Sequence, residues 1–168
     1  GTSVQGHAEI LKETYPDEDV AVVVAYDVRV YRDLRGHYDP EAPNPLIGMS
    51  SADFAAVAAG VYVANGVRVH MLDPRGDTYM STPELSYAIR RLGAHGGLNV
   101  SASHNHPDDN GGKIYNRYGG QDVPPDDEIL ARRVEGITRV KRVPFEEALG
   151  SGRIALLGPE ENRRYLEL

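Results

Sequence analysis

The chain has 168 residues, which is long enough for one domain with a substantial hydrophobic core. It carries 25 acidic residues against 18 Lys and Arg, a formal net charge of −7, so a basic nucleic-acid-binding face is not expected. It contains no cysteine, which excludes disulfides and thiolate metal sites. The most apolar run, residues 20–26, is too short to span a bilayer, and the opening residues lack the features of a signal peptide. We therefore expect a cytoplasmic protein that binds neither nucleic acid nor membranes.

In chain order, the first half predicts a helix, a strand and a long loop. Residues 4–15 have apolar side chains at helical spacing, and the pattern ends before Pro16. Residues 20–26, VAVVVAY, form a continuous apolar run rich in β-branched side chains, which is typical of a strand buried on both faces. Residues 30–49 hold several glycines and prolines without apolar periodicity. A loop of that length indicates a functional segment or an insertion.

The rest of the chain predicts further alternation of helices and strands. In the helical segment 81–97, Thr82 can cap the helix and Pro83 suits the first helical position. The Ala-rich segment 50–66, earlier in the chain, predicts a helix that Ser50 or Ser51 can cap. The remaining elements are predicted as helices at 50–66 and 124–137, strands at 67–72, 98–103 and 153–157, and the start of a helix after residue 158.

This order of elements predicts an α/β fold, a three-layer α/β/α sandwich around a mixed, mostly parallel sheet. We assign residues 1–157 to one domain. Residues 158–168 begin like a helix that breaks off, so we assign them to the start of a truncated second domain or to a linker helix. In such sheets, ligands bind beyond the carboxyl ends of the strands. Two of these ends are polar here, at residues 27–29 and at residues 101–113.

Residues 101–113, SASHNHPDDNGGK, hold the densest group of reactive side chains in the chain. Asn, Asp, Gly and Pro favour turns for local backbone reasons, so a plain surface turn explains the part from Pro107 to Gly112. It does not explain why a serine and two histidines gather at a strand end beside a lysine. A metal site and an activated nucleophile are the two functional interpretations.

The metal interpretation rests on the spacing His104-x-His106-x-Asp108-Asp109. It is similar to the zinc-binding run of the metallo-β-lactamase-like hydrolases, in which imidazoles and a carboxylate hold the metal. Asp109 stands where that family has histidine, and no histidine follows His106 in the chain. The downstream ligands of that family therefore have no counterpart.

The nucleophile interpretation centres on Ser103, because a serine hydroxyl reacts only when a base, a metal or a set of donors assists it. His104 and Lys113 are the nearby assistants. The amides of Gly111 and Gly112 can approach an anion closely because no Cβ intervenes. Such a loop could also hold a phosphoryl group on the serine, with its charge of about −1.5 to −2.

The same stretch resembles the active-serine loop of the α-D-phosphohexomutases, the phosphoglucomutase and phosphomannomutase family, usually written T-A-S-H-N-P-x-x-x-N-G-x-K. The residues that match it in register are Ser101, Ala102, Ser103, His104, Asn105, Asn110, Gly111 and Lys113. Ser101 replaces threonine but keeps a hydroxyl, whereas His106 replaces proline. The earlier stretch VVVAYDVR is similar to the family's V-x-G-x-D-x-R, with Ala25 in place of the glycine. The resemblance covers nearly the whole chain but only the first domain of that family.

The resemblance implies a mutase that moves phosphate between C1 and C6 of a hexose phosphate. Ser103 would carry a phosphoryl group, donate it to form a bisphosphorylated sugar, and take a phosphoryl group back from the other position. Lys113 would supply acid/base help or neutralise charge, and His104 would orient the loop. The residues implied to bind substrate or phosphate are Asn105, Asn110, Gly111 and Arg29.

The resemblance also implies Mg²⁺, held by the phosphate on Ser103 and by aspartates of a D-x-D-x-D-R loop. That loop, the sugar-recognition loop and the C-terminal phosphate loop of the family do not occur in this sequence. The partners implied are the hexose phosphate and the remaining domains of a longer parent chain. We therefore expect the isolated 168 residues to have negligible mutase activity.

Alternatives of other classes stay open at this point. A His/Asp metallohydrolase would bind zinc through His104 and His106, and a degenerate domain would bind a sugar phosphate without turnover. Asp27 and Arg29 are more typical of a structural ion pair at a strand end than of catalytic groups. The sequence does not distinguish among hexose phosphates and assigns no role to His106.

Overall fold

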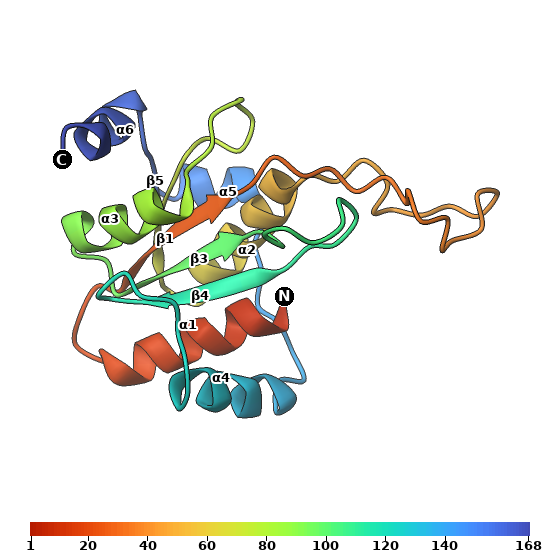
Figure 1. The fold of residues 1–168 in the computed structure, drawn as a ribbon. Coiled ribbons are helices and arrows are strands. Elements are labelled where there is room, and N and C mark those ends of the chain that lie inside the picture. Colours follow the sequence, from red (N-terminus) through yellow and green to blue (C-terminus); the bar gives the residue numbers. More distant parts are fainter.

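A computed structural model describes all residues from 1 to 168. The chain forms one β-sheet of 5 strands, in the order β4-β3-β1-β2-β5, with helices on both faces (Figure 1). Strands β1, β3, β2 and β5 run parallel, and β4 is antiparallel to β3. The strands are β1 (Ala21–Tyr26), β2 (Arg68–Met71), β3 (Gly96–Val100), β4 (Gly112–Asn116) and β5 (Ile154–Leu156). The predicted α/β/α sandwich with a mixed, mostly parallel sheet is therefore confirmed.

The helices divide unequally between the two faces of the sheet. Helices α3 and α6 cover one face, and α1, α2, α4 and α5 cover the other. Their bounds are α1 (Thr2–Thr14), α2 (Ser51–Ala64), α3 (Thr82–Leu92), α4 (Asp126–Glu135), α5 (Phe145–Gly150) and α6 (Pro159–Leu166). None of them combines the length and the apolar character that crossing a bilayer requires.

Strand β1 lies in the middle of the sheet, and its apolar run serves both cores. Successive side chains of a strand point to opposite faces. Val22 and Val24 therefore join the larger core under α1 and α2, whereas Val23 and Ala25 join the smaller core under α3. All six residues of β1 are buried, as the continuous apolar run predicts.

Helix caps explain where α2 and α3 begin. Ser50 accepts a hydrogen bond from the amide of Asp53, whose carboxylate accepts one from the Ser50 amide, so Ser50, one of the two predicted candidates, caps α2. The prediction for α3 was wrong by one residue, because Ser81 and not Thr82 makes the cap. The Thr82 hydroxyl instead accepts a hydrogen bond from Asn99 of β3, at 3.1 Å.

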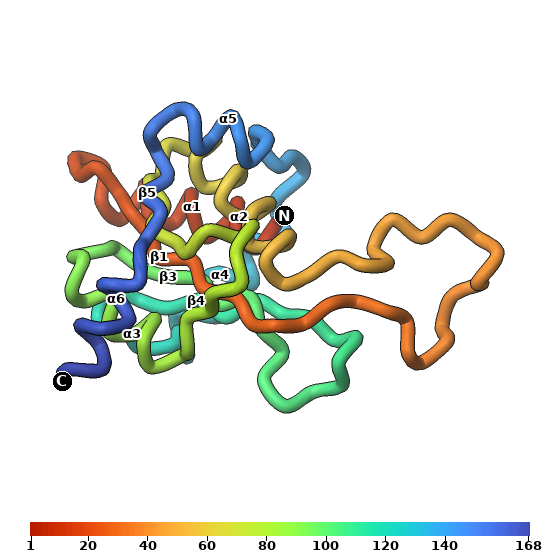
Figure 2. Tube along the Cα trace, turned by 90° about the horizontal axis from the view of Figure 1, so that it is seen from above, coloured from red at the N-terminus to blue at the C-terminus, as the bar shows by residue number.

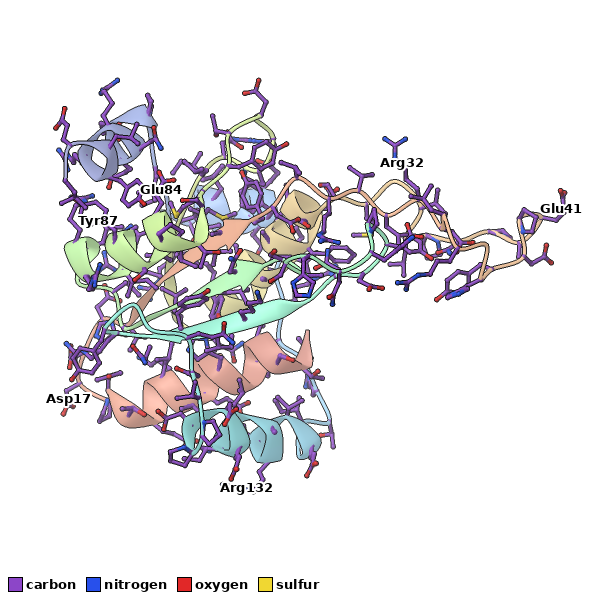
Figure 3. The ribbon with its side chains drawn as sticks, in the orientation of Figure 1. Asp17, Arg32, Glu41, Glu84, Tyr87 and Arg132 are labelled. Carbon is purple, nitrogen blue, oxygen red and sulfur yellow. The ribbon has the colours of Figure 1, made fainter.

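Helix α6 packs on α3. Arg91 of α3 forms an ion pair with Glu161, and Asn162 donates a hydrogen bond to Glu84 at 3.1 Å. Tyr87 lies against Tyr165, with 5.9 Å between the ring centroids. Figure 3 shows Glu84 and Tyr87 on the side of α3 that faces α6. Side chains thus tie residues 159–166 to the body of the fold.

Residues 30–49 form a long arm that leaves the sheet beyond the carboxyl end of β1 (Figures 1 and 2). Its base is closed by an antiparallel bridge between Val30 and Ser50. Inside the base, Tyr31 and Met49 are joined by a backbone hydrogen bond of 2.9 Å. The arm contains no helix or strand, in agreement with the predicted loop.

Candidate active site

The sequence 101–111 connects β3 to β4 and forms the serine loop, as it is called below. Its neck is closed by a hydrogen bond from the Ser101 amide to the Gly111 carbonyl, at 2.9 Å. The returning strand pairs Lys113 with Asn99. An antiparallel hairpin therefore carries the lysine back alongside the start of the loop. The antiparallel strand β4, which the sequence patterns did not predict, is the element that places Lys113.

The hairpin brings Ser103 and Lys113 into contact. The Lys113 ammonium donates a hydrogen bond to the Ser103 hydroxyl. Ser103 is exposed, and the alanine before it is buried and anchors the chain. The two residues that the sequence motif singled out are therefore in contact, on an exposed part of the loop.

The backbone at Ser103 is strained. Its φ is +55°, a left-handed conformation that costs a non-glycine residue on the order of 1 kcal/mol. A hydrogen bond of 3.1 Å from the Ser103 amide to the Ser101 hydroxyl supports this turn. Strain of this kind persists only where the surroundings hold it, and such positions cluster at functional sites.

The other predicted residues of the loop take different places. His104 and Asn105 are exposed beside Ser103. Asn110 lies at the neck, where its amide group donates to the Ser51 hydroxyl at 3.3 Å and its oxygen accepts from the Gly111 amide at 2.7 Å. In this structure the Gly111 amide thus forms a hydrogen bond within the serine loop.

Arg29 reaches into the serine loop from the end of β1. Its guanidinium donates to main-chain carbonyls of the loop and to the carboxylate of Asp27. Partial burial alone would raise the pKa of the Asp27 carboxyl, but hydrogen bonds from Ser51, Arg29 and Ser101 hold that pKa below its ordinary value. Asp27 and Arg29 therefore form the expected ion pair, at 2.9 Å.

Asp108 and Asp109 connect the serine loop to the arm. The Asp108 carboxylate accepts hydrogen bonds of 3.2 Å from the amides of Arg32 and Arg35. Asp109 forms a two-point ion pair with the Arg35 guanidinium, at 2.6 and 3.2 Å. The hydrogen bond from Arg35 is the main cause that lowers the pKa of Asp109. Both acids are thus occupied by arm residues.

The spacing of His104, His106 and the following acids resembles a zinc-binding run, but the fold does not bring these side chains together as metal ligands. No group of three or more His, Cys, Asp or Glu side chains is arranged to hold a metal ion. The His106 ring nitrogen Nδ1 instead accepts the amide of Asp108, at 3.2 Å. The metallohydrolase alternative therefore has no ligand set among residues 1–168.

A large cavity of the molecule lies away from Ser103. It has a volume of about 640 Å³ and is lined by residues of α1, α4 and the turn after β4, together with His95. His95 directly precedes β3, whereas Ser103 follows it, so the cavity and the serine lie at opposite ends of the same strand. Ser103 itself sits on an open surface.

Comparison with known proteins places this geometry in a family. Residues 49–141, more than half of the chain, match the family described as phosphoglucomutase/phosphomannomutase, alpha/beta/alpha domain I. The chain belongs to this family. The matched range includes the serine loop and Lys113, and it corresponds to the first domain of the mutases.

Relatives and solved structures agree with this assignment. A phosphoglucomutase of Staphylococcus saprophyticus is 34% identical over 118 residues, covering 68% of this chain and 21% of the relative. A phosphoribomutase of Saccharomyces cerevisiae is 30% identical over 131 residues, covering 78% of this chain and 18% of the relative. The chain thus spans about a fifth of the length of these relatives.

Two solved structures share the fold of the mutase domain. A protein of Thermus thermophilus, provisionally named a phosphomannomutase, superposes with a TM-score of 0.61 at 25% identity, over 85% of this chain and 27% of the other. The Paramecium phosphoprotein pp63/parafusin, a phosphoglucomutase, superposes with a TM-score of 0.55 at 21% identity, over 83% and 22% of the two chains. The second likeness concerns the fold alone.

Sequence reasoning left Ser51 out of the site. It is only 1% exposed, and its hydroxyl donates to Asp27 at 2.6 Å while it accepts from Asn110. Nothing in the sequence around a helix start marks such a role, because both partners are distant along the chain. Only the meeting of α2, β1 and the serine loop reveals it.

Proposed function

We propose that this chain is the serine-bearing domain of an α-D-phosphohexomutase, which moves phosphate between C1 and C6 of a hexose phosphate. One observation carries the proposal: the exposed hydroxyl of Ser103, on a strained turn, receives a hydrogen bond from the Lys113 ammonium. Membership in the mutase family supports it. Residues 1–157 are then the first domain of a longer mutase, and residues 158–168 lead toward the next domain.

The chemistry proposed for Ser103 is a phosphoryl transfer in two directions. In the first, a sugar hydroxyl attacks the phosphorus of phosphorylated Ser103, and the bond between phosphorus and the serine oxygen breaks. The sugar becomes bisphosphorylated, and its hydroxyl proton passes to solvent. In the second, the free Ser103 hydroxyl attacks the phosphate at the other sugar position, the bond between phosphorus and that sugar oxygen breaks, and the released oxygen takes a proton from solvent. Most of the catalysis in such transfers comes from positioning and electrostatic stabilisation.

Lys113 is placed to manage the proton on the serine oxygen. When the phosphoryl group leaves Ser103, the Lys113 ammonium donates a proton to the serine oxygen. The resulting amine takes the proton back when the Ser103 hydroxyl attacks in the return step. Its charge also offsets that of the transferred group. His104, exposed beside Ser103, orients the loop or contacts the transferred phosphate.

Asn105, Asn110 and Gly111 are the loop residues that we propose for phosphate binding. Asn105 is exposed next to the serine. At the loop neck the Gly111 amide donates a hydrogen bond to the Asn110 side-chain oxygen, and the Asn110 amide group donates to Ser51, so these groups turn to a phosphate only if the hydrogen bonds open. Asn105 is accordingly the member of this group that reaches a phosphate without rearrangement.

The family implies a metal cofactor, and we propose that it is Mg²⁺. The residues of this chain do not complete such a site, because no three acidic or histidine side chains converge and the arm occupies Asp108 and Asp109. The phosphate on Ser103 would be the one ligand from this domain. The aspartate ligands belong to a further domain of the mutase.

We also propose that residues 1–168 alone lack mutase activity and that the full-length protein acts in the cytoplasm. Ser103 is exposed and does not line the cavity of about 640 Å³ at the far end of β3. Measurable turnover of glucose 1-phosphate by residues 1–168 alone would contradict this. The substrate class should be assayed widely, because one relative is named a phosphoribomutase.

The decisive experiment replaces the serine in the full-length mutase. Ser103→Ala removes the phosphoryl carrier, and we expect turnover of hexose 1-phosphates to fall at least about a thousandfold. Ser151→Ala, at the end of α5, is the matched control and should leave turnover unchanged. A Ser103→Ala protein that keeps its activity would remove this residue from the chemistry.

A further inference from the structure

The guanidinium of Arg29 has five N–H donors, and every one is engaged within the protein. Nε donates to the Asp27 carboxylate at 2.9 Å. The two terminal nitrogens donate to main-chain carbonyls of the serine loop, those of His106 at 2.6 Å, Asp109 at 3.2 Å, Ser103 at 2.7 Å and Asn105 at 3.1 Å. No donor remains for a phosphate oxygen.

The position of Arg29 is itself fixed by a network of hydrogen bonds around its partner Asp27. Its Asp27 partner also accepts the Ser51 hydroxyl at 2.6 Å and the Arg29 amide at 3.1 Å. Ser51 in turn accepts the side-chain amide of Asn110, at the other end of the loop. The Arg29 side chain is only 13% exposed. The network therefore joins the end of β1, the start of α2 and both ends of the serine loop.

We infer that Arg29 is a positioning residue, which fixes the main chain of the serine loop and thereby the hydroxyl of Ser103, and that it does not bind substrate phosphate. The inference rests on the proposed phosphoryl transfer at Ser103. It replaces the direct phosphate contact that the sequence motif implied for Arg29.

The physical reason lies in the carbonyl of Ser103. Arg29 holds the carbonyl of the same residue whose φ is +55°, so the clamp acts on the strained turn directly. Without these hydrogen bonds the turn can relax toward the ordinary φ region, and the hydroxyl moves away from Lys113. A misplacement of about 1 Å at a reacting group costs on the order of a hundredfold in rate.

The test compares Arg29→Met with Arg29→Lys in the full-length mutase. Met keeps the apolar stem without donors, and Lys keeps the charge with too few donors for the four carbonyls. Arg32→Met is the matched control, because Arg32 lies on the same segment but is exposed and points away from the body of the protein in Figure 3. Two quantities are measured for each variant, steady-state kinetics and amide hydrogen exchange across residues 101–111.

For Arg29→Met we expect kcat to fall on the order of a hundredfold while KM changes by less than about threefold. Exchange in the serine loop should accelerate at least about tenfold, and exchange in β1 and β3 should stay as it is. Arg29→Lys should fall between the wild type and Arg29→Met, and Arg32→Met should match the wild type. If Arg29→Met does not fold, Arg29→Lys decides by the same two measurements.

A raised KM with unchanged loop exchange would make Arg29 a phosphate ligand and overturn the inference. An unchanged kcat would overturn it as well. Failure of the proposed function is a separate result: the unsubstituted protein would then show no mutase turnover. The exchange comparison would still decide whether Arg29 holds the loop.

Discussion

The two ends of β3 differ in how they use polar side chains. At the amino end, histidines are buried and bonded internally: His7 contacts the Tyr62 hydroxyl at 2.7 Å, and His95 accepts the Ala21 amide at 3.1 Å. At the carboxyl end, Ser103 is exposed on a strained turn beside Lys113. The amino end therefore uses its polar groups to hold the fold, whereas the carboxyl end presents them to solvent.

Cavity volume and strand direction point to opposite ends of β3. A cavity of about 640 Å³ opens at the amino end, where His7 and His95 line it. In open α/β sheets, however, ligands bind in the crevice beyond the carboxyl ends of the parallel strands. The exposed, strained turn at Ser103 lies at the end of the sheet where ligands bind in such folds, and the cavity does not.

After the loss of Ser103 itself, the largest effect is expected from the lysine at the carboxyl end. Lys113→Met in the full-length mutase should lower kcat by about a hundredfold or more, because the serine oxygen loses its proton donor and acceptor. The free energy of unfolding should change little, since Lys113 is not in the core. Lys141→Met, at an exposed position, is the control. Equal activity of Lys113→Met and Lys141→Met would contradict the proposal that the catalytic groups lie at the carboxyl end of β3.

The amino end should instead show a pH-dependent stability. Burial lowers the pKa of His7 from its ordinary 6.5 to about 4, so between these pH values the unfolded state binds more protons than the folded state. The stability that this residue contributes is complete above pH 6.5 and is lost as pH falls toward 4. The loss is up to about 3 kcal/mol.

Denaturant unfolding of the wild type and of His7→Gln at pH 7.5, 6, 5 and 4 measures this term. The difference between the two proteins isolates the contribution of His7 to the pH dependence. His70, whose pKa is also lowered by burial, is present in both proteins and cancels. The variant should lose part of the pH dependence of the wild type above pH 4. Identical pH profiles would show that His7 does not titrate as its burial demands.

A backbone contact at the amino end should give the next largest effect. A Cβ added at Gly96 would lie 2.8 Å from the Tyr115 carbonyl oxygen and 3.2 Å from His7 Nε2. Gly96→Ala should therefore cost about 1–3 kcal/mol in the free energy of unfolding. Gly150→Ala, where no atom lies within 4 Å of the new Cβ, should stay within about 0.5 kcal/mol. A neutral Gly96→Ala would mean that β3 and β4 can separate locally.

The smallest effect is expected at the cap of α2. Ser50→Ala removes the acceptor for the Asp53 amide and should cost about 1 kcal/mol of stability. Because Ser51 rather than Ser50 contacts Asp27, kcat should remain within about twofold. Thermal unfolding and steady-state kinetics check the two parts. A large loss of kcat would show that the cap also governs the serine loop.

The strongest local patterns predicted most of the fold. The apolar run of β1, the caps of the helices and the turn residues each act over a few neighbouring residues, so their structures follow from the sequence. The family motif also indicated Ser103 and Lys113, which the hairpin indeed joins. The strand at 98–103 was shifted, because β3 starts at Gly96, whose lack of a side chain gives no apolar signal, and ends at Val100.

What the sequence did not show depends on distant partners. Strand β4 has only a short apolar pair between polar residues, and its pairing with β3 gives it its structure. Helix α5 spans only Phe145–Gly150, too short a segment for a periodic pattern, and it packs on α2. The role of Arg29 was hidden for the same reason, since its acceptors are main-chain carbonyls, which carry no sequence signature.

The most direct measurement is the location of phosphate on the protein itself. Full-length mutase is incubated with a hexose 1,6-bisphosphate, and phosphopeptides are sequenced by mass spectrometry. We expect a single phosphoryl adduct on Ser103, which Ser103→Ala abolishes. An adduct on Ser101 or elsewhere, or none under conditions of turnover, would contradict a phosphoryl carrier at the end of β3.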